Sequence, residues 1–335
     1  MGDSQPGVLP LAEHLAALLP TTDRTSLAQS VIPSLIQSIA DIADTLRVSH
    51  HVALAGTANA FGDDQLNVDV AAEAILRTAL ASCPSVVAAS SEEDPVEVAV
   101  PHETAATSPE RYAVAFDPLD GSSIIAPNWT VGTIIGIWDG PTALAQDPAT
   151  AQIASILGVF GPRTTAVVAI RVPGGTPSCF EVAIDPSPAR AHTVIRPSVR
   201  LNSAPHKTRY FAPANLRAAA DEPRYAALVS RFITERWTLR YSGGLVPDLI
   251  HALVKGHGVY ASPVTARSAA KLRRLYELCP VALIMECAGG SAVDSADGSR
   301  VLGRSVLDCD ERGGLVCGNV EDVAEVVSAL LGSSQ

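Results

Sequence analysis

The segment from Phe116 to Ser123, which reads Phe-Asp-Pro-Leu-Asp-Gly-Ser-Ser, is the feature of this chain that most constrains its fold. It directly follows the apolar run Tyr112–Ala115, which has the character of a buried β-strand. Its two aspartates offer the hard oxygen ligands that Mg²⁺ takes, and the amides after Gly121 could hold phosphate oxygens. An ordinary turn between two strands is the alternative, because Asp-Pro and Asp-Gly are common turn dipeptides. The segment therefore predicts a strand that ends in a turn and, if its acids are functional, a cation beside a phosphate.

Composition narrows the class of protein. The 335 residues suffice for one large domain or two ordinary ones, and 47% apolar residues can fill a core. No apolar run reaches the roughly 18 residues that a membrane-spanning helix needs. The net charge of −11 disfavours a nucleic-acid partner. The first 19 residues contain Asp3 and Glu13 but no Lys or Arg, unlike a secretory signal or a transit peptide. These features predict a cytoplasmic protein with neither a membrane nor a nucleic-acid partner.

Helical and strand-like patterns occur in blocks along the chain. Apolar residues at helical spacing predict two N-terminal helices, one from Leu27 to Leu46 and one from Val68 to Ala81. A Ser26–Gln29 capping pattern would open the first, and Pro33 would kink it or shift its start. Short β-type runs follow at residues 86–89, 113–116, 131–138, 164–170, 259–260 and 301–302, and helix-like stretches at 217–234, 246–255, 266–287 and 321–331.

The arrangement of these blocks indicates the fold class. Apolar periodicity fades between Ser187 and Pro205, where prolines cluster, so we expect a domain junction there. We predict an N-terminal domain over residues 22–202 that carries the metal site, and a C-terminal domain over residues 203–335 that binds substrate. Helices first, then strands, then alternating elements are typical of an α/β fold of stacked layers in two parts.

Four further acids need a common explanation. Asp69 opens the second predicted helix, Glu92 and Glu93 directly follow a strand-like run, and Glu286 lies late in an apolar helical run. Because adjacent strands of an α/β sheet bring their carboxyl ends to one edge, acids that follow two such strands should converge. Taken one at a time, Asp69 can be explained as a helix cap, and Glu92 and Glu93 as a solvated turn. Glu286 is harder to explain in this way, because burying an ionised carboxylate without a partner costs free energy. A cation between converging carboxylates resolves their repulsion.

These acids and their surroundings resemble the class I fructose-1,6-bisphosphatase family, and within it the sedoheptulose-1,7-bisphosphatase branch is nearer. The resemblance is carried by residues 91–94 (Ser-Glu-Glu-Asp), 116–123, 271–273 (Lys-Leu-Arg), 275–277 (Leu-Tyr-Glu) and 286–290 (Glu-Cys-Ala-Gly-Gly), and towards the sedoheptulose branch by residues 61–66, 161–165, 215–218 and 238–248. It implies a layered α-β-α-β-α fold with two subdomains. It also implies hydrolysis of the 1-phosphate of a ketose bisphosphate with two or three Mg²⁺ ions, or Mn²⁺ in their place.

Carried over residue by residue, the resemblance implies a set of site residues. The expected metal ligands are Glu92, Glu93, Asp117, Asp120, Glu286 and the backbone carbonyl of Leu119. Asp69 and Glu93 would activate the attacking water. The expected phosphate-binding residues are Gly121, Ser122 and Ser123, and those expected to hold the sugar and its distal phosphate are Asn215, Arg240, Tyr241, Lys271 and Arg273.

Departures from the family pattern bear on the substrate. The fructose enzymes have a tyrosine where this chain has Ala218, and the run Tyr260–Pro263 offers no clean equivalent of their second substrate tyrosine. Both losses fit a sugar larger than fructose, although Ala126 stands where the sedoheptulose branch usually has an aspartate. We therefore expect sedoheptulose 1,7-bisphosphate as the substrate. Fructose 1,6-bisphosphate hydrolysis and a catalytically silent phosphosugar-binding homologue are the alternatives. The resemblance also implies a homodimer or homotetramer.

Overall fold

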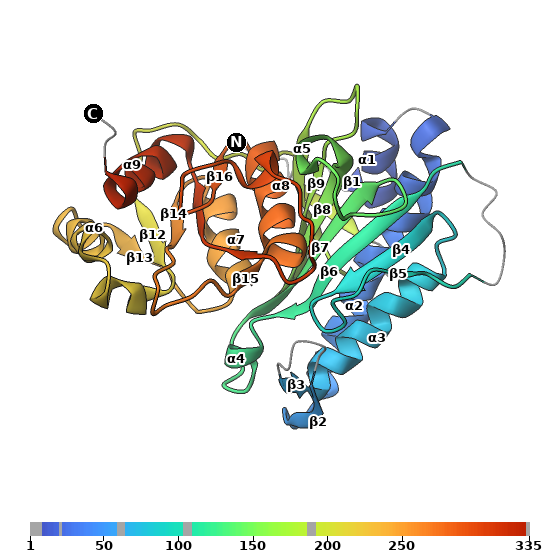
Figure 1. The fold of residues 1–335 in the computed structure, drawn as a ribbon. Coiled ribbons are helices and arrows are strands. Elements are labelled where there is room, and N and C mark those ends of the chain that lie inside the picture. The colour runs from blue at the N-terminus through green and yellow to red at the C-terminus, as the bar shows by residue number, and fades with distance from the viewer. Residues whose placement is uncertain (1–8, 20–21, 59–63, 103–108, 186–191, 333–335) are drawn as a thin grey trace, which may run out of the picture.

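The computed structural model describes residues 9–19, 22–58, 64–102, 109–185 and 192–332. Within these residues the chain builds five layers in the order helix, sheet, helix, sheet, helix (Figure 1). The predicted layered α/β fold class is thereby confirmed.

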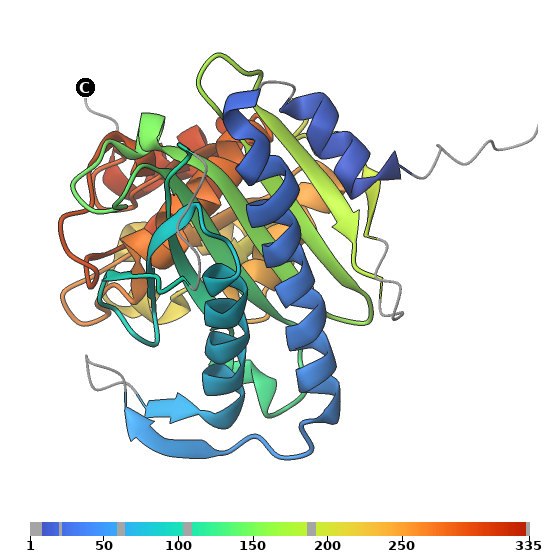
Figure 2. The same cartoon turned by 90° about the vertical axis from the view of Figure 1, so that its right-hand side faces the viewer.

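The helices lie on three levels. In chain order they are α1 (Leu11–Leu18), α2 (Ile32–Val48), α3 (Asn67–Ala81), α4 (Ser122–Ile125), α5 (Pro148–Ala151), α6 (Pro223–Thr234), α7 (Leu245–Lys255), α8 (Cys279–Cys287) and α9 (Val320–Leu331). Figure 2 shows α1, α2 and α3 lying across the front of the larger sheet. In Figure 1, α7 and α8 lie between the two sheets, and α6 and α9 cover the far side of the smaller one.

The larger sheet has nine strands. In spatial order they are β1 (Leu9–Pro10), β11 (Thr193–Arg196), β10 (Ser178–Ala183), β9 (Thr164–Ile170), β8 (Gln152–Phe160), β7 (Val131–Asp139), β6 (Tyr112–Asp120), β4 (Val86–Ser91) and β5 (Val98–Ala99). Its neighbouring strands run antiparallel except for β4 and β6, which run parallel. The carboxyl ends of these two strands therefore meet at one edge of the sheet.

The smaller sheet has five strands. In spatial order they are β13 (Thr238–Leu239), β12 (Tyr210–Pro213), β14 (Val259–Ser262), β18 (Leu315–Gly318) and β16 (Ser291–Val293). Two short ribbons complete the fold: β2 (Leu54–Ala58) pairs with β3 (Asp64–Leu66), and β15 (Leu272–Arg273) pairs with β17 (Arg312–Gly313). The predicted boundary between residues 202 and 203 falls in the connection between the sheets and stays a prediction. No helix in the described ranges is long and apolar enough to span a bilayer.

Three apolar cores hold the layers together. On β6, Val114 and Phe116 belong to the core shared with α2 and α3, whereas Ala113 and Ala115 belong to the core around α8, because successive strand residues point to opposite faces. A third core joins the smaller sheet to α6 and α9. Since the middle core contains residues from both sheets, the two halves of the chain are packed into one body around α7 and α8.

The start of the first long helix differs from the prediction. A π-helical turn, Leu27–Val31, runs directly into α2, and Pro33 lies in the first turn of α2, where a proline costs no helical hydrogen bond. The predicted Ser26 cap is wrong, because the side chain of Ser26 makes no capping bond. Instead the buried carboxylate of Glu110 accepts the backbone N–H of Ser26 (2.8 Å) and of Leu27 (3.1 Å).

The predicted helix over residues 266–287 is only half right. The chain there first pairs as β15, then forms a π-helical turn at Arg274–Leu278, and only then enters α8. Pro280 lies in the first turn of α8, where it is tolerated. The predicted helix over residues 217–234 is likewise divided, because Pro223 begins α6 after a short 3₁₀ turn, Leu216–Ala220. Residues 301–302, predicted as a strand, lie in a 3₁₀ turn.

Candidate active site

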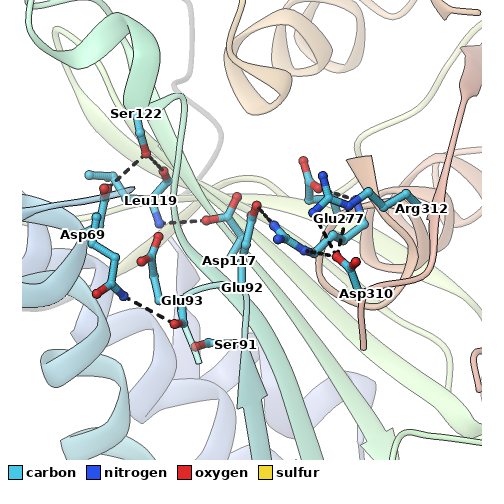
Figure 3. Close-up of polar contacts among 12 residues, drawn as sticks. Asp69, Ser91, Glu92, Glu93, Asp117, Leu119, Ser122, Glu277, Asp310 and Arg312 are labelled. Carbon is cyan, nitrogen blue, oxygen red and sulfur yellow. Dashed lines mark hydrogen bonds and ion pairs between the residues drawn. The ribbon is translucent and has the colours of Figure 1, made fainter. Parts of the chain in front are cut away.

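The parallel pair β4 and β6 places the first two acids side by side. Ser91 and Phe116 are register partners, and the amide of Glu92 donates to the carbonyl of Phe116 over 3.0 Å. Glu92 and Asp117, which directly follow these two partners, therefore lie at the same edge of the sheet (Figure 3). The predicted convergence of acids that follow two adjacent strands is seen for this pair.

A third acid joins them from the middle helical layer. One carboxylate oxygen each of Glu92, Asp117 and Glu277 lies within 4.8 Å of the others. Glu277 belongs to the π-helical turn that precedes α8, and such turns are frequent at functional sites. One of its oxygens accepts the amide of Arg273 over 2.6 Å. Three carboxylates from three segments thus form a group of the size that holds a divalent cation.

Glu286, one of the six expected metal ligands, lies elsewhere. Its carboxylate is held by Arg171 (2.8 Å) and by Arg300 (2.9 Å to each oxygen) at the far end of α8. Glu286 follows Glu277 by nine residues, which at 1.5 Å per residue is about 13 Å along a helix. The structure therefore does not bring Glu286 to the group of Glu92, Asp117 and Glu277. The cost of burying an unpaired carboxylate in an apolar run, which argued for Glu286, applies equally to Glu277 between Leu275 and Cys279.

Asp69 and Glu93 form a second acidic pair beside this group. Asp69 lies in the first turn of α3, where one oxygen accepts the amide of Leu66 (3.1 Å) and the other accepts the hydroxyl of Ser122 (3.1 Å). The Oε2 atom of Glu93 is buried and has no hydrogen-bond partner within the described part of the chain. Burial raises the pKa of Asp69 to about 6 and that of Glu93 to about 7, and Asp69 and Glu92 add to the shift of Glu93.

The buried acids carry more negative charge than the nearby guanidinium of Arg273 offsets. Burial, together with repulsion by Glu92, raises the pKa of both Asp117 and Glu277 well above the usual range. Buried carboxylates are stable as anions only when they are paired or bound to a metal. The orphaned Oε2 of Glu93 and the raised pKa values of its neighbours show that the residues present fit a bound cation.

Asp120 links the acids to the middle helical layer. Its two oxygens accept the amides of Leu245 (3.0 Å) and Val246 (2.7 Å), the first two residues of α7. Gly132 on β7 is the register partner of Asp120, and a Cβ there would lie 2.4 Å from Cβ of Val246. The close approach of α7 to the sheet therefore requires glycine at position 132. Burial raises the pKa of Asp120 to about 7 against the effect of the two amides.

The remaining residues of the octapeptide turn the chain into α4. The amide of Leu119 donates to Asp117 (3.0 Å), and its carbonyl lies 3.1 Å from the hydroxyl of Ser122. Gly121 has a φ of +97°, which favours glycine, and it precedes the first turn of α4. The amides of Ser122 and Ser123 lie in that turn, where helix geometry provides no internal acceptor for them. They are therefore positioned to donate to an external anion.

Arg273 lies at the acids and not with the other predicted substrate residues. Its guanidinium is almost fully buried and pairs with Glu92 and, at 3.2 Å, with Asp310. Asp310 also accepts two bonds from Arg312, at 3.0 and 2.9 Å. Arg273 is thus a cation beside the carboxylate group, and the prediction that it grips the distal end of the substrate is not supported by this placement.

Three of the other predicted substrate residues gather on the smaller sheet. Asn215 has a φ of +49°, and its side chain binds the carbonyl of Pro263 (2.6 Å) and the hydroxyl of Ser268 (2.6 Å). The backbone of Asn215 is also hydrogen-bonded to the side chain of Tyr241, whose pKa is raised mainly by partial burial. Arg240 is exposed, and its guanidinium carbon lies 5.6 Å from the ring centre of Tyr210. Lys271 is exposed just before β15.

A layered α/β fold with closely spaced buried carboxylates beside a helix start is the arrangement expected of a metal-dependent phosphatase. Two family models match the chain: "Fructose-1-6-bisphosphatase, N-terminal domain" over residues 20–185 and "Fructose-1-6-bisphosphatase, C-terminal domain" over residues 204–331. The chain belongs to the fructose-1,6-bisphosphatase family. The family resemblance and the enzyme class predicted from sequence, a sugar-bisphosphate phosphatase, are confirmed.

Individual relatives fall into both branches of the family. The chain is 35% identical over 328 residues to the chloroplastic sedoheptulose-1,7-bisphosphatase of Chlamydomonas reinhardtii, covering 97% of this chain and 79% of that protein. It is 36% identical over 278 residues to the class 1 fructose-1,6-bisphosphatase of Syntrophotalea carbinolica, covering 81% of this chain and 79% of that protein. A crystal structure described as a candidate sedoheptulose-1,7-bisphosphatase of Toxoplasma gondii superposes with a TM-score of 0.83 at 32% identity, covering 96% of this chain and 98% of that one.

Proposed function

We propose that this protein hydrolyses the 1-phosphate of a ketose bisphosphate in a Mg²⁺-dependent reaction, with sedoheptulose 1,7-bisphosphate as the preferred substrate. The observation that carries the proposal is the meeting of Glu92, Asp117 and Glu277 within 4.8 Å, in an environment that raises the pKa of Asp117 and Glu277. Such a group attracts a hard divalent cation, and divalent cations are the usual partners of transferring phosphoryl groups.

The proposed metal ligands follow from this placement. They are Glu92, Glu93, Asp117, Asp120, Glu277 and the carbonyl of Leu119. Glu277 takes the place first given to Glu286. Two or three Mg²⁺ ions, or Mn²⁺ in their place, would neutralise charge on the phosphoryl oxygens and lower the pKa of water when bound.

Glu93 and Asp69 are the proposed proton acceptors. Their pKa values of about 7 and about 6 suit a general base that works near neutral pH. Ser122 bridges Asp69 to the carbonyl of Leu119, so the proposed base is connected to the strand that carries Asp117. The role of Asp69 is to take or share the proton released when water attacks phosphorus.

The substrate would lie between the two groups of residues. The amides of Ser122 and Ser123 are proposed to hold the reacting phosphate, with Arg273 as the nearest cation on the acid side. Asn215, Arg240, Tyr241 and Lys271 are proposed to hold the sugar and its second phosphate.

The preference for the longer sugar rests on the similarity to proteins named sedoheptulose-1,7-bisphosphatases and on Ala218. The decisive experiment compares kcat/KM for sedoheptulose 1,7-bisphosphate and fructose 1,6-bisphosphate with and without Mg²⁺. We expect Mg²⁺-dependent release of phosphate, with the seven-carbon substrate preferred at least about tenfold. A preference for fructose 1,6-bisphosphate would reject the proposed substrate, and binding without hydrolysis of either would identify a catalytically silent homologue.

Two further properties belong to the proposal. We propose a homodimer or homotetramer, in which Arg240 reaches an active site across the interface, as the family resemblance implies; light scattering with size-exclusion chromatography tests the assembly. A cytoplasmic location stays a prediction from the sequence, because the sedoheptulose relatives from Chlamydomonas reinhardtii, wheat and spinach are named chloroplastic.

A further inference from the structure

Two buried carboxylates hold the loop from Arg240 to Gly244 and the start of α7 that follows it. The proposed metal ligand Asp120 accepts the amides of Leu245 and Val246. A second aspartate, Asp248, lies one turn into α7, and only 7% of its surface is exposed. Asp248 is not among the proposed metal ligands or proton acceptors.

Asp248 points back towards the loop that precedes its own helix. Its Oδ1 accepts the amide of Ser242 (2.6 Å) and the hydroxyl of Ser242 (2.7 Å). Its Oδ2 accepts the amide of Gly243 (3.2 Å), a residue whose φ of +105° favours glycine. The hydroxyl of Ser242 in turn accepts the amide of Gly244 (3.3 Å). Both carboxylate oxygens of Asp248 are therefore used to define the backbone of this loop.

The two carboxylates and the Ser242 hydroxyl together accept five consecutive amides. Those of residues 242 and 243 go to Asp248, that of residue 244 to the Ser242 hydroxyl, and those of residues 245 and 246 to Asp120. Hydrogen bonds to a buried carboxylate are about twice as strong as neutral ones, so this stretch of backbone has little freedom. The loop is thereby set in register with the proposed metal site.

Arg240 and Tyr241 lie just before this stretch. The amide of Arg240 is anchored on the carbonyl of Phe211 (2.9 Å), and the next anchor along the chain is Ser242 on Asp248. Both side chains are exposed, and the backbone that carries them is held on both sides, in addition to their own contacts with Asn215 and Leu239. Loss of the second anchor would loosen this backbone while leaving Glu92, Asp117 and Glu277 in place.

We propose that Asp248 is a positioning residue for substrate: it holds the loop that presents Arg240 and Tyr241, and so sets affinity for the distal phosphate end of the sugar without taking part in the chemistry. This inference rests on the proposed function. It assigns Asp248 to binding, whereas Asp120 on β6, which holds the first two residues of α7, belongs to the proposed metal site.

The test uses D248N, which keeps the shape of the side chain but replaces one acceptor oxygen with a donor that faces the Gly243 amide. We expect KM for sedoheptulose 1,7-bisphosphate to rise about tenfold while kcat changes by less than about threefold. Affinity for sedoheptulose 7-phosphate, measured by calorimetry, should fall to a similar extent. Inorganic phosphate binding in the presence of Mg²⁺, which reports on the metal side, should be unchanged.

Two controls separate positioning from general loosening. D322N removes another buried carboxylate of the same half of the chain, one that pairs with Arg209 over 2.7 Å, and should leave KM within twofold of wild type. In a double-mutant cycle, D248N added to R240A should weaken binding by less than about twofold beyond R240A alone, because both act on the same contact. If D248N does not fold, S242A removes one bond to Asp248 and should raise KM about threefold.

The possible results distinguish a failure of the role of Asp248 from a failure of the proposed function. A D248N variant with wild-type KM and wild-type affinity for sedoheptulose 7-phosphate overturns the inference alone. So does a loss of kcat at constant KM, or an effect that multiplies with that of R240A. A wild type that binds sedoheptulose 7-phosphate but hydrolyses neither bisphosphate rejects the proposed function, while weaker binding by D248N would still support the role of Asp248.

Discussion

The two ends of strand β6 carry buried carboxylates in opposite situations. Glu110 lies two residues before β6 begins. Its carboxylate accepts hydrogen bonds from the amides of Ser26 and Leu27 and from the hydroxyl of Tyr112, the last over 2.6 Å. Burial alone would raise the pKa of Glu110, but these hydrogen bonds outweigh it and the pKa is lowered. At the other end, the pKa values of Asp117 and Asp120 are raised.

This difference separates a structural acid from functional ones. Glu110 receives its donors from the protein and needs nothing more, so its charge stabilises the fold. The acids at the far end repel one another, and the amides that donate to Asp117 and Asp120 do not offset this, so a cation or protons must balance them. Burial alone does not distinguish the two cases, whereas the presence of neighbouring carboxylates does. The predictions that follow test this contrast at both ends of the strand.

Replacing Asp117 with asparagine should give the largest effect. D117N keeps an oxygen for the amide of Leu119 but loses a charged ligand, so kcat/KM should fall by about 10³-fold or more. Because the change also removes repulsion from Glu92, the variant should melt no lower than wild type in EDTA. Steady-state kinetics and calorimetry check both parts. A D117N enzyme that is destabilised yet active would reverse the contrast.

Replacing Glu93 with glutamine should give the second-largest effect on catalysis. E93Q removes both a proposed ligand and a proposed base, and kcat should fall at least about 10²-fold. The fold should persist, because the Oε2 atom of Glu93 has no hydrogen-bond partner among the described residues to lose. Near-normal turnover in E93Q would remove Glu93 from the proposed chemistry.

At the other end of β6, E110Q should cost stability and leave catalysis unchanged. Glutamine has one acceptor oxygen for three donors, so the free energy of unfolding should fall by about 1–3 kcal/mol. Since the folded pKa of Glu110 is lowered, its stabilisation is full above the unfolded value near 4.5 and is lost as pH falls below it. Urea melts of wild type and E110Q should therefore converge towards acid pH. Equal stability at pH 7, or a gap that widens in acid, would contradict this.

The smallest effect concerns protons released on metal binding. With pKa values of about 6 for Asp69 and about 7 for Glu93, the metal-free site is partly protonated at pH 6.5. Because the pKa values of Asp117, Asp120 and Glu277 are raised as well, Mg²⁺ binding should release at least about one proton at pH 6.5 and fewer at pH 9. Titration calorimetry in two buffers with different ionisation enthalpies measures this number. Heats that do not depend on the buffer at pH 6.5 would argue that the acids are already ionised.

The local part of this site could be predicted from the sequence. Glu92 and Asp117 come directly after apolar strands, and the ends of neighbouring parallel strands meet by geometry. The layered fold was likewise accessible, because the order of helical and strand-like blocks limits the arrangements available.

The other contacts depend on long-range packing that leaves no periodic signal. Where the π-helical turn before α8 begins decides whether Glu277 or Glu286 faces the sheet, and both lie in apolar runs. Asp120 meets the start of α7 across 125 residues, and Arg273 meets Glu92 across 181. Neither pairing can be read from spacing, because each depends on how α7 and α8 fit between two sheets.

The most direct test of the account compares E277Q with E286Q. Glu277 lies with Glu92 and Asp117, whereas Glu286 forms ion pairs with the partly exposed Arg171 and Arg300. Mg²⁺ affinity by calorimetry and Mg²⁺-dependent release of phosphate from sedoheptulose 1,7-bisphosphate should both be measured. We predict that E286Q stays within twofold of wild type in both, while E277Q loses at least about tenfold in Mg²⁺ affinity and about 10²-fold in kcat/KM. An E277Q enzyme that binds Mg²⁺ and turns over like wild type, or an E286Q enzyme that does neither, would contradict the account.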